Sequence, residues 1–269
     1  MRLFKFLRKF FFKPSFDIKI FSKKNLFEIL KIVNKVGFSR FTVNEISFDL
    51  PDFKKVIVIA PHPDDEVIGA GGTIIKLIKK KCNVKIIYMT SGRLNEKEIR
   101  EQELKRVCNK LGVKNHIIGG VANQKLFGSK IIAEIIEDFK PNVILMPFIL
   151  DDNDDHRKTH LQFKAALKIL PKANYKRKIT VWSYQIYGPL IVNKVVDISD
   201  IISRKEALIK NYKSQFRSRD WAHYTSGMNA WNSRFLNKKK TKAWAECFFV
   251  QSIIEYENFF KDIFKNQSD

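Results

Sequence analysis

The residues best suited to chemistry lie in one short segment that follows an apolar run. His62, Asp64, Asp65 and Glu66 place one imidazole and three carboxylates within five positions. Acidic groups packed beside a buried strand cost much free energy unless a cation neutralises them. Imidazole and carboxylate groups are also ligands that divalent metals use in proteins. We therefore expect a metal site in this segment.

A helix N-terminus would explain part of the same pattern. Acidic residues at the start of a helix satisfy free N–H groups and the helix dipole, and residues 73–80 have a helical pattern. A role at the helix N-terminus would account for one of the two aspartates. It leaves His62 unexplained beside Asp64, Asp65 and Glu66, and it leaves a second cluster unexplained as well. We therefore favour the metal site.

The second cluster lies in residues 151–160, which read Asp-Asp-Asn-Asp-Asp-His-Arg-Lys-Thr-His. His156 and His160 are four positions apart and share one face of a helix. The cluster follows an apolar run at residues 143–146, which predicts another buried strand. Because the carboxyl ends of parallel strands meet at one edge of a sheet, this cluster can face His62 and Asp65.

The elements that must position these residues alternate along the chain. Four apolar runs are typical of strands, at residues 56–60, 84–89, 115–118 and 143–146. Helical patterns lie between them, at 73–80, 95–111 and 129–139, and a further helix is expected at 156–170. Later strands are expected at 180–187 and 194–198 and a helix at 202–212. The alternation predicts an α/β, Rossmann-like three-layer fold with a mostly parallel central sheet. No dinucleotide-type glycine fingerprint follows the first strand, so we expect no nicotinamide cofactor.

The charge of the chain is strongly positive. Its 269 residues include 50 Lys and Arg against 28 Asp and Glu, a formal net charge of +22. An anionic partner would be attracted by such a surface. Codon bias is the other explanation, because Lys, Ile, Asn and Phe are all used heavily throughout the chain. We favour codon bias over an anionic partner as the cause of the positive charge. No recognised nucleic-acid-binding motif occurs, so we expect no nucleic-acid partner.

Residues 1–50 form a basic, Phe-rich extension ahead of the main domain, which we place at 51–269. Within the extension, residues 1–14 alternate bulky apolar residues with Lys and Arg, a pattern typical of a helix in a membrane interface. A helix packed on the domain itself, or a disordered basic end, would fit equally. Peripheral membrane contact through the N-terminus is therefore one hypothesis.

The cysteines and the hydropathy pattern bear on the cellular location of the protein. The three cysteines are far apart and in no paired motif, as expected of reduced core residues in a cytosolic protein. No apolar run reaches the length of about 18 residues that a transmembrane helix needs, and no signal-peptide pattern follows the start. We expect a cytoplasmic protein, with the inner face of the membrane as a further location.

The segment from Pro61 to Glu66 resembles the signature of the PIG-L/LmbE-like deacetylases, zinc-dependent enzymes that act on N-acetylglucosamine derivatives. Asp155-His156 with His160 resembles the second motif of this family. Weaker similarities are Arg100 with Glu103, Tyr-x-Ser-Gln at residues 212–215 and Ala-Glu-x-Phe at residues 245–248. Together they cover roughly residues 54 to 250.

The resemblance implies roles for individual residues. One zinc ion per chain would be held by His62, Asp65 and His156. Asp64 would be the general base that takes a proton from the attacking water and passes it to the leaving amine. Glu66 and His160 would orient the metal ligands, although His160 could instead lie on the outer face of its helix. Arg93, Ser214 and Gln215 would contribute to substrate binding or support the site.

One position departs from the family pattern. Many members carry a histidine three residues before the metal-binding histidine, where it is thought to stabilise charge on the reacting amide. Here that position is Asn153, which can donate a hydrogen bond but carries no charge. Either Asn153 performs a weaker version of the catalytic role, or another group replaces it, or the substrate differs.

The implied reaction is hydrolysis of the acetamido group of an N-acetylated amino sugar, giving free amine and acetate. The substrate would be a small-molecule or lipid-linked amino sugar, or one linked to a nucleotide or glycan, for example in surface polysaccharide assembly. Two alternatives stay open: a deacylase of another modified sugar or metabolite, and a non-catalytic basic protein bound to membranes. No feature of the sequence indicates an oligomeric state.

The loop at residues 217–224 contains Arg217, Arg219, Trp221 and Tyr224. Aromatic faces stack on sugar rings and Arg forks match phosphate groups, so we expect this loop at the edge of a sugar or phosphate site. A basic surface loop with Trp221 packed inward is an equally good interpretation.

Overall fold

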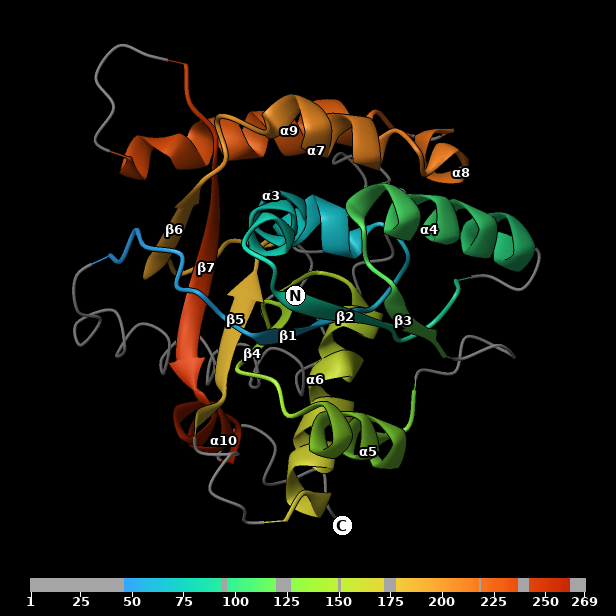
Figure 1. Cartoon of the computed structure of the whole chain (residues 1–269), viewed down its shortest axis with the longest axis vertical. Helices are drawn as coiled ribbons and strands as arrows, with labels where there is room; N and C mark the ends of the chain where they lie inside the picture. The colour runs from blue at the N-terminus through green and yellow to red at the C-terminus, as the bar shows by residue number, and fades with distance from the viewer. Residues whose placement is uncertain are drawn as a thin grey trace, which may run out of the picture.

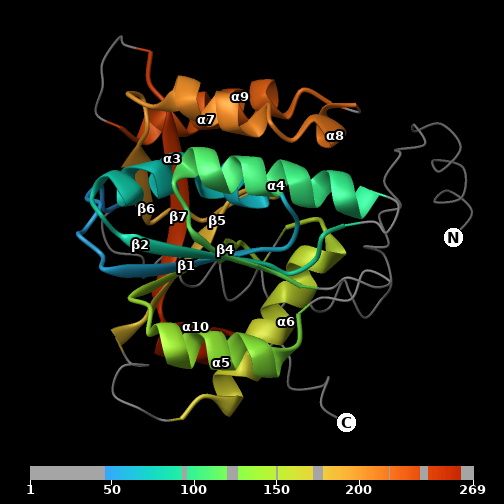
Figure 2. The same cartoon turned by 45° about the vertical axis from the view of Figure 1, so that its right-hand side comes forward.

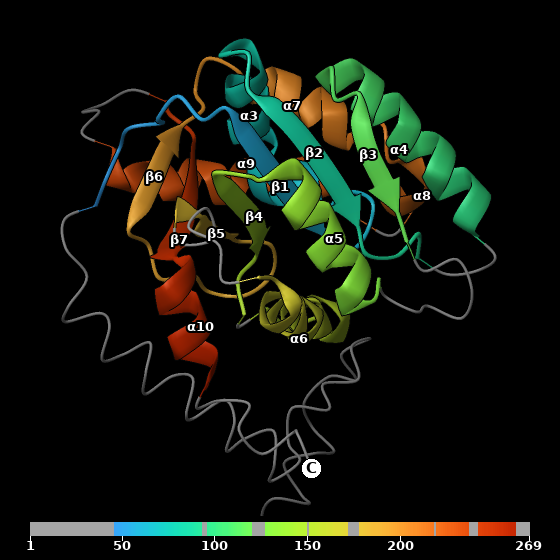
Figure 3. The ribbon, with the colours of Figure 1, turned by 60° about the horizontal axis from the view of Figure 1, so that its bottom comes forward.

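A computed structural model describes residues 46–92, 96–119, 127–149, 151–171, 178–217, 219–236 and 242–261. In this part of the chain the strands form one seven-stranded sheet in the order β3-β2-β1-β4-β5-β7-β6 (Figures 1 and 3). The strands are β1 (Lys55–Ala60), β2 (Asn83–Tyr88), β3 (Asn115–Ile118), β4 (Val143–Pro147), β5 (Thr180–Tyr184), β6 (Lys194–Asp197) and β7 (Ala245–Ser252). The helices are α3 (Asp65–Lys79), α4 (Lys97–Leu111), α5 (Ser129–Phe139), α6 (Asp154–Ile169), α7 (Ile202–Ile209), α8 (Lys213–Phe216), α9 (Trp221–Asn232), the 3-10 turn η4 (Ser233–Phe235) and α10 (Ile253–Lys261).

The sheet is parallel from β3 through β5, and β7 pairs antiparallel with both β5 and β6. The predicted mostly parallel α/β fold is therefore confirmed. Strand β7 was not predicted as a strand, although its Ala-Glu-Cys-Phe segment was noted for its resemblance to the family. The predicted strand at 180–187 ends at Tyr184, and the helix predicted at 202–212 ends at Ile209.

Successive residues of a strand point to opposite faces of a sheet, so β1 contributes to two hydrophobic cores. Val56 and Val58 belong to the core under α3, α4 and α7. Ile57 and Ile59 belong to the core under α5, α6 and α10. Figure 2 shows these two helical layers on either side of the sheet. Such two-faced burial explains why β1 is apolar at every position from 56 to 60.

Helix α3 begins at Asp65, eight residues earlier than the start expected at 73. Three glycines between positions 69 and 72 weaken the helical pattern there, because glycine disfavours helices. Tertiary packing overrides that preference. A Cβ atom at Gly69 would lie 2.2 Å from the Tyr184 ring, so only glycine lets this helix approach β5 so closely.

Helix α3 is broken at Ala70, whose φ of −139° and ψ of 16° are not helical. The break leaves backbone groups without their usual helical partners, and two buried side chains from other elements bind them. Lys205 Nζ donates to the Ile68 carbonyl at 2.9 Å. Glu246 accepts from the N–H groups of Gly72 and Thr73, both at 2.7 Å, and lies 2.6 Å from Lys205 Nζ. The first half of α3, which carries Asp65 and Glu66, is therefore separated by a kink from the second half.

The last described helix, α10, packs on the core. Its Phe260 is buried against α6 and lies 4.5 Å, ring to ring, from Tyr256. The three cysteines are buried and free, as predicted.

Residues 46–50 run beside β6. Ser47 N donates to the Asn193 carbonyl at 3.0 Å, and Val195 N donates to the Ser47 carbonyl at 2.9 Å. The predicted domain division at residue 50 stays a prediction. The expectations for the first part of the chain, including the interfacial helix at 1–14, fall outside the described residues. None of the helices described here is long and apolar enough to cross a membrane.

Candidate metal centre

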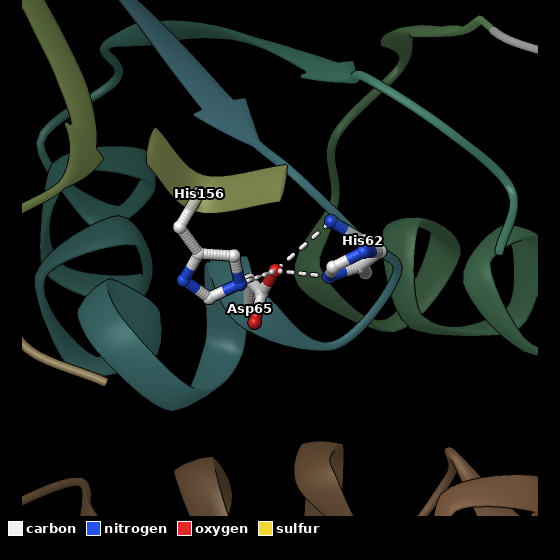
Figure 4. Close-up of side chains that lie close together, drawn as sticks. All are labelled: His62, Asp65 and His156. Carbon is white, nitrogen blue, oxygen red and sulfur yellow. Dashed lines mark hydrogen bonds and ion pairs between the residues drawn. The ribbon is translucent and has the colours of Figure 1, made fainter. Parts of the chain in front are cut away.

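His62, Asp65 and His156 converge on one point (Figure 4). Asp65 Oδ2 lies 3.2 Å from His62 Nδ1 and 3.1 Å from His156 Nε2. One ligand atom from each residue lies within 4.8 Å of the others. The three residues that were predicted as metal ligands are thus brought together, although 90 or more positions separate His156 from the other two in the sequence.

The position of the site follows from the strand order. His62 and Asp65 lie in the turn that connects β1 to α3, and His156 lies in the first turn of α6, which follows β4. Strands β1 and β4 are parallel neighbours, but β1 is followed in the chain by β2 on its other side. Such a reversal opens a crevice at the carboxyl ends of the strands. The two segments therefore meet there.

The donor atoms fit a divalent cation. Asp65 Oδ1 and both ring nitrogens of His156 are buried without a hydrogen-bond partner. The ring nitrogens lie close to carboxylate oxygens but are not aligned with them as in a hydrogen bond. Unpaired buried polar atoms are costly and rare in folded proteins. A metal bound between Asp65 and His156 Nε2 would give these two groups a partner, while His156 Nδ1 faces the carboxylate of Asp151. Two imidazoles with one carboxylate form a suitable set of nitrogen and oxygen donors.

Two further carboxylates hold the imidazoles, and neither was assigned from the sequence. Asp155 Oδ2 lies 3.1 Å from His62 Nε2, and Asp151 Oδ1 lies 3.0 Å from His156 Nδ1. A carboxylate on the outer nitrogen of a metal-binding histidine fixes the orientation of the ring. The acidic run at 151–155 was noted as a cluster, but its sequence does not show which carboxylate reaches which ring.

The same carboxylates control the protonation of the imidazoles. Burial, the largest single effect, disfavours the charged ring, but the carboxylates of Asp155 and Asp65 outweigh it and raise the pKa of His62 to about 9. Burial is likewise outweighed at His156, where Asp65 and Asp151 raise the pKa to about 10. The site therefore favours positive charge, whether from protons or from a metal ion.

Asp64, the expected general base, lies beside the candidate ligands and is 8% exposed. Burial, followed by the charge of Asp65, raises its pKa well above the usual value, while Arg100 acts in the opposite direction. Its φ of 117° lies in a region that residues other than glycine rarely adopt. Strain of this kind persists only where the surrounding structure imposes it.

Glu66 imposes part of that geometry. Its Oε2 accepts from the backbone N–H of Asp64 at 3.0 Å, and its Oε1 accepts from the hydroxyl of Tyr212. Burial raises the pKa of Glu66 to about 7, although the hydrogen bond from Tyr212 lowers it. Glu66 thus supports the turn, in agreement with its predicted supporting position. Tyr212 was part of a noted motif but had been given no role.

His160 is buried, so the alternative of an outer-face residue is wrong. Its Nε2 lies 2.8 Å from the Pro147 carbonyl and its Nδ1 lies 3.0 Å from the Tyr256 hydroxyl. Burial lowers the pKa of His160 to about 3. The ring therefore ties α6 to the end of β4 and to α10.

Asn153 caps α6. Its side-chain oxygen accepts from the backbone N–H of Asp155 at 2.8 Å, as expected for an N-cap residue. This contact gives Asn153 a structural role in positioning Asp155. Its predicted catalytic role stays a prediction.

Ser214 and Gln215 attach α8 to α4. The Ser214 hydroxyl donates to Glu103 at 2.6 Å, and Arg100 donates to the Gln215 side-chain oxygen at 2.7 Å. Their roles in substrate binding stay predictions, and Arg93 lies outside the described residues.

Tyr187, which had no predicted role, stacks on His156 with ring centroids 5.6 Å apart.

Comparison with known proteins identifies the family that this chain resembles. Residues 57–167 match the PIG-L family model, described as GlcNAc-PI de-N-acetylase. The matched region contains His62, Asp64, Asp65 and His156.

Similar sequences and structures extend over most of the chain. A diacetylchitobiose deacetylase of Thermococcus kodakarensis is 29% identical over 67% of this chain and 76% of its own. A probable N-acetyl-alpha-D-glucosaminyl L-malate deacetylase 2 of Bacillus cereus is 25% identical over 63% of this chain and 92% of its own.

Solved structures share the fold. The N,N'-diacetylchitobiose deacetylase of Pyrococcus horikoshii has a TM-score of 0.63 at 22% identity, covering 91% of this chain and 97% of its own. The 4-carboxy-2-hydroxymuconate hydratase of Pseudomonas putida has a TM-score of 0.61 at 16% identity, covering 73% and 95%. Since these two proteins carry different activities, the fold does not by itself select a reaction.

Proposed function

We propose, on the premise that residues 57–167 belong to the PIG-L family, that this protein is a metal-dependent N-deacetylase of an N-acetylated amino sugar. The observation that carries the proposal is the convergence of His62, Asp65 and His156 next to the buried carboxylate of Asp64. A metal-binding set beside a candidate base is the arrangement that metal-assisted amide hydrolysis requires.

We propose zinc as the metal, with one ion per chain. A bound divalent cation would supply Lewis acidity, which makes a water molecule a better nucleophile at neutral pH and polarises the acyl oxygen. His62, Asp65 and His156 would hold it, while Asp155 and Asp151 keep the two imidazoles oriented.

Asp64 would move the proton. Its carboxylate would take one proton from the water that attacks the acyl carbon, and would deliver it to the nitrogen as the carbon–nitrogen bond breaks. The products are acetate and the free amine. Glu66 supports this role because it holds the backbone N–H of Asp64.

The relatives support the proposed substrate class. Two proteins that are similar over more than three fifths of this chain are described as deacetylases of N-acetylated sugar compounds. We propose the same class here. The finer expectations stay proposals: a lipid or nucleotide carrier, polysaccharide assembly, a cytoplasmic location and contact with the inner face of a membrane.

The test combines metal content with acetate release. The purified protein, its Asp64→Asn variant and its His156→Ala variant are analysed for bound metal and assayed on N-acetylglucosamine conjugates. We expect about one zinc per native chain and loss of roughly 10²-fold or more of the activity in Asp64→Asn with the metal retained. The His156→Ala variant should lose both. Acetate release by Asp64→Asn at the native rate would refute the assigned role of Asp64.

Asn153 favours a second candidate, a hydrolase that removes a different acyl group from a modified sugar. Its side chain caps α6 and carries no charge, so it differs from the histidine of the family pattern. The same assay should include N-formyl and longer N-acyl conjugates. Metal binding with turnover of only these compounds would select the second candidate.

A further inference from the structure

A buried ion pair from two other elements lies at the break in helix α3. Lys205 of α7 and Glu246 of β7 have their charged atoms 2.6 Å apart, and both side chains are buried. Lys205 Nζ also donates to the side-chain oxygen of Asn229, from α9, at 2.8 Å. In Figures 1 and 2, α7 and α9 lie over α3, on the side away from α5 and α6. Three elements that are distant in sequence therefore meet at the break.

The signs of the two charges match the helix ends that they contact. Lys205 donates to the carbonyl of Ile68, near the carboxyl end of the first half of α3, at 2.9 Å. Glu246 accepts from the N–H groups of Gly72 and Thr73, at the amino end of the second half. The helix dipole favours a cation at a carboxyl end and an anion at an amino end. The ion pair therefore caps both halves and stabilises the break between them.

The contact at Ile68 leads directly to the candidate base. The carbonyl of Ile68 accepts from Lys205, and the N–H of the same residue donates to the carbonyl of Asp64 at 3.0 Å. Asp65 lies three positions before Ile68, which is less than one helical turn. Lys205 therefore holds the short segment that carries both the candidate base and one candidate metal ligand.

Tyr184 supports the same segment from the sheet. Its hydroxyl donates to the carbonyl of Ile59 at 2.8 Å, and its ring lies so close to Gly69 that a Cβ atom there would be 2.2 Å away. This ring limits how closely the first half of α3 approaches the sheet. Lys205 supplies a hydrogen bond to the helix backbone from α7. The segment is thus held between two elements.

We propose that Lys205, held in place by Glu246, is a positioning residue of the candidate metal centre. By binding the carbonyl of Ile68, it keeps the first half of α3 in the direction that brings Asp65 to the two histidines. The proposal rests on the proposed function, because it concerns the affinity of this centre for a metal ion. Lys205 acts through the backbone of α3 and takes no part in the reaction itself.

A purely structural role for the ion pair leads to a different expectation. An interaction that only stabilises the fold lowers the free energy of unfolding when it is lost, but folded molecules keep their affinity for metal. An interaction that positions a ligand lowers the metal affinity of molecules that are still folded. Groups that orient metal ligands typically contribute about 10- to 100-fold to metal affinity.

The test measures cobalt binding to folded protein. Co²⁺ reports on its ligands through its visible absorption spectrum, and competition with a chelator gives its affinity. All proteins are measured well below their unfolding transitions, with circular dichroism as the check. We expect Lys205→Met to weaken cobalt binding by about 10- to 100-fold and to alter the spectrum.

A double variant separates positioning from the effect of an unpaired charge. Lys205→Met combined with Glu246→Gln leaves no uncompensated charge in the break. Its cobalt affinity should stay low, because the donor to the carbonyl of Ile68 is still missing. If Lys205→Met alone does not fold, this double variant provides the same test.

The matched control is Leu208→Ala. Leu208 lies on the same helix as Lys205 and is buried, but its apolar side chain cannot donate to the backbone of α3. A buried Leu→Ala change costs about 2–5 kcal/mol, so it destabilises the protein by an amount comparable with the loss of Lys205. This variant should keep the native cobalt affinity and spectrum.

Each other outcome has a definite meaning. Native cobalt affinity in the Lys205 variants would overturn the proposal, and so would an equal loss of affinity in Leu208→Ala. A native protein that binds neither cobalt nor zinc would overturn both the metal centre and the role of Lys205. A native protein that binds cobalt through Lys205-dependent positioning but releases no acetate would refute the proposed reaction alone.

Discussion

Asp64 combines a proposed catalytic role with an unfavourable backbone conformation. A φ of 117° costs a residue with a Cβ atom free energy that glycine does not pay. The hydrogen bond from its N–H to Glu66 and the burial of the turn keep it there. Stability is therefore given up at the position where the base must point toward the metal ligands.

This strain can be measured by comparing two variants that both remove the carboxylate. Asp64→Gly should be more stable than Asp64→Ala by roughly 1–3 kcal/mol, because only glycine accepts the positive φ without strain. Urea unfolding of both variants measures the difference, and both should lack deacetylase activity. Equal midpoints would show that the turn relaxes and that Asp64 is not strained.

His160 should make the protein sensitive to acid. Its pKa is about 3 in the folded protein and close to 6.5 when exposed, so between these values the unfolded chain binds a proton that the folded chain does not. Stability should therefore fall as the pH falls from about 6.5, by at most about 1.4 kcal/mol per pH unit for this proton.

The measurement is urea unfolding of the native protein and His160→Gln at several pH values with a chelator present. The variant should be less stable overall but should lose less stability between pH 6 and pH 4. His223→Gln, which changes an exposed histidine, is the control and should keep the native slope. Parallel slopes for His160→Gln and the native protein would contradict the assignment.

At the scale of single residues, the sequence predicts a metal site because the residue types at 62–66 are unusual within a few positions, and the family resemblance selects His62, Asp65 and His156 as the candidate ligands. It does not predict Asp151, Asp155 or Tyr187 as partners of the imidazoles. Their contacts depend on distances across the folded chain, and other acidic residues in the same run have the same chemistry. Tyr212 is a similar case, since its hydroxyl reaches Glu66 from 146 positions away.

At the scale of elements, the break in α3 shows how distant side chains complete a helix. Lys205 from α7 and Glu246 from β7 bind the backbone groups that the break leaves free. The sequence predicts neither the break nor the early start of α3, because the glycines weaken the helical pattern. It predicts α5 well, since its buried residues recur with the helical period, and it predicts β1 because a continuous apolar run is typical of a strand that is buried on both faces.

The Lys205–Glu246 pair can be tested with a double-mutant cycle. Lys205→Met should cost roughly 3–5 kcal/mol, because it leaves the buried carboxylate of Glu246 without its cation. Adding Glu246→Gln should cost less than the sum of the two single changes. Lys76→Met serves as control, since Lys76 lies on α3 and forms a partly exposed ion pair with Asp200, and surface pairs contribute about 0–1 kcal/mol. Additive effects at Lys205 and Glu246 would refute the coupling.

At the scale of the whole molecule, the metal centre joins two halves of the sheet. His62 and Asp65 follow β1, while His156 follows β4, so a metal ion held by these candidate ligands would connect two segments that meet only in the folded sheet. A ligand that binds only the folded state stabilises it in proportion to the logarithm of its concentration.

Removal of the metal should therefore lower the melting temperature. With metal at about 100 times its Kd, the stabilisation is about 2.7 kcal/mol, which corresponds to roughly 5–10 °C for a chain of this size. A chelator should reverse the shift in the native protein and in Asp64→Asn. His156→Ala should melt at the same temperature with and without metal, and a metal-dependent shift in that variant would place the ion elsewhere.

Asp151 holds both the imidazole of His156 and the backbone of Tyr187, one with each carboxylate oxygen. A substrate that contacts Tyr187 would therefore share Asp151 with His156. Any coupling through Asp151 would change the affinity for the metal and the affinity for the substrate by one and the same factor, because linkage is reciprocal. A metal titration with and without substrate would then give the same ratio of affinities as a substrate titration with and without metal.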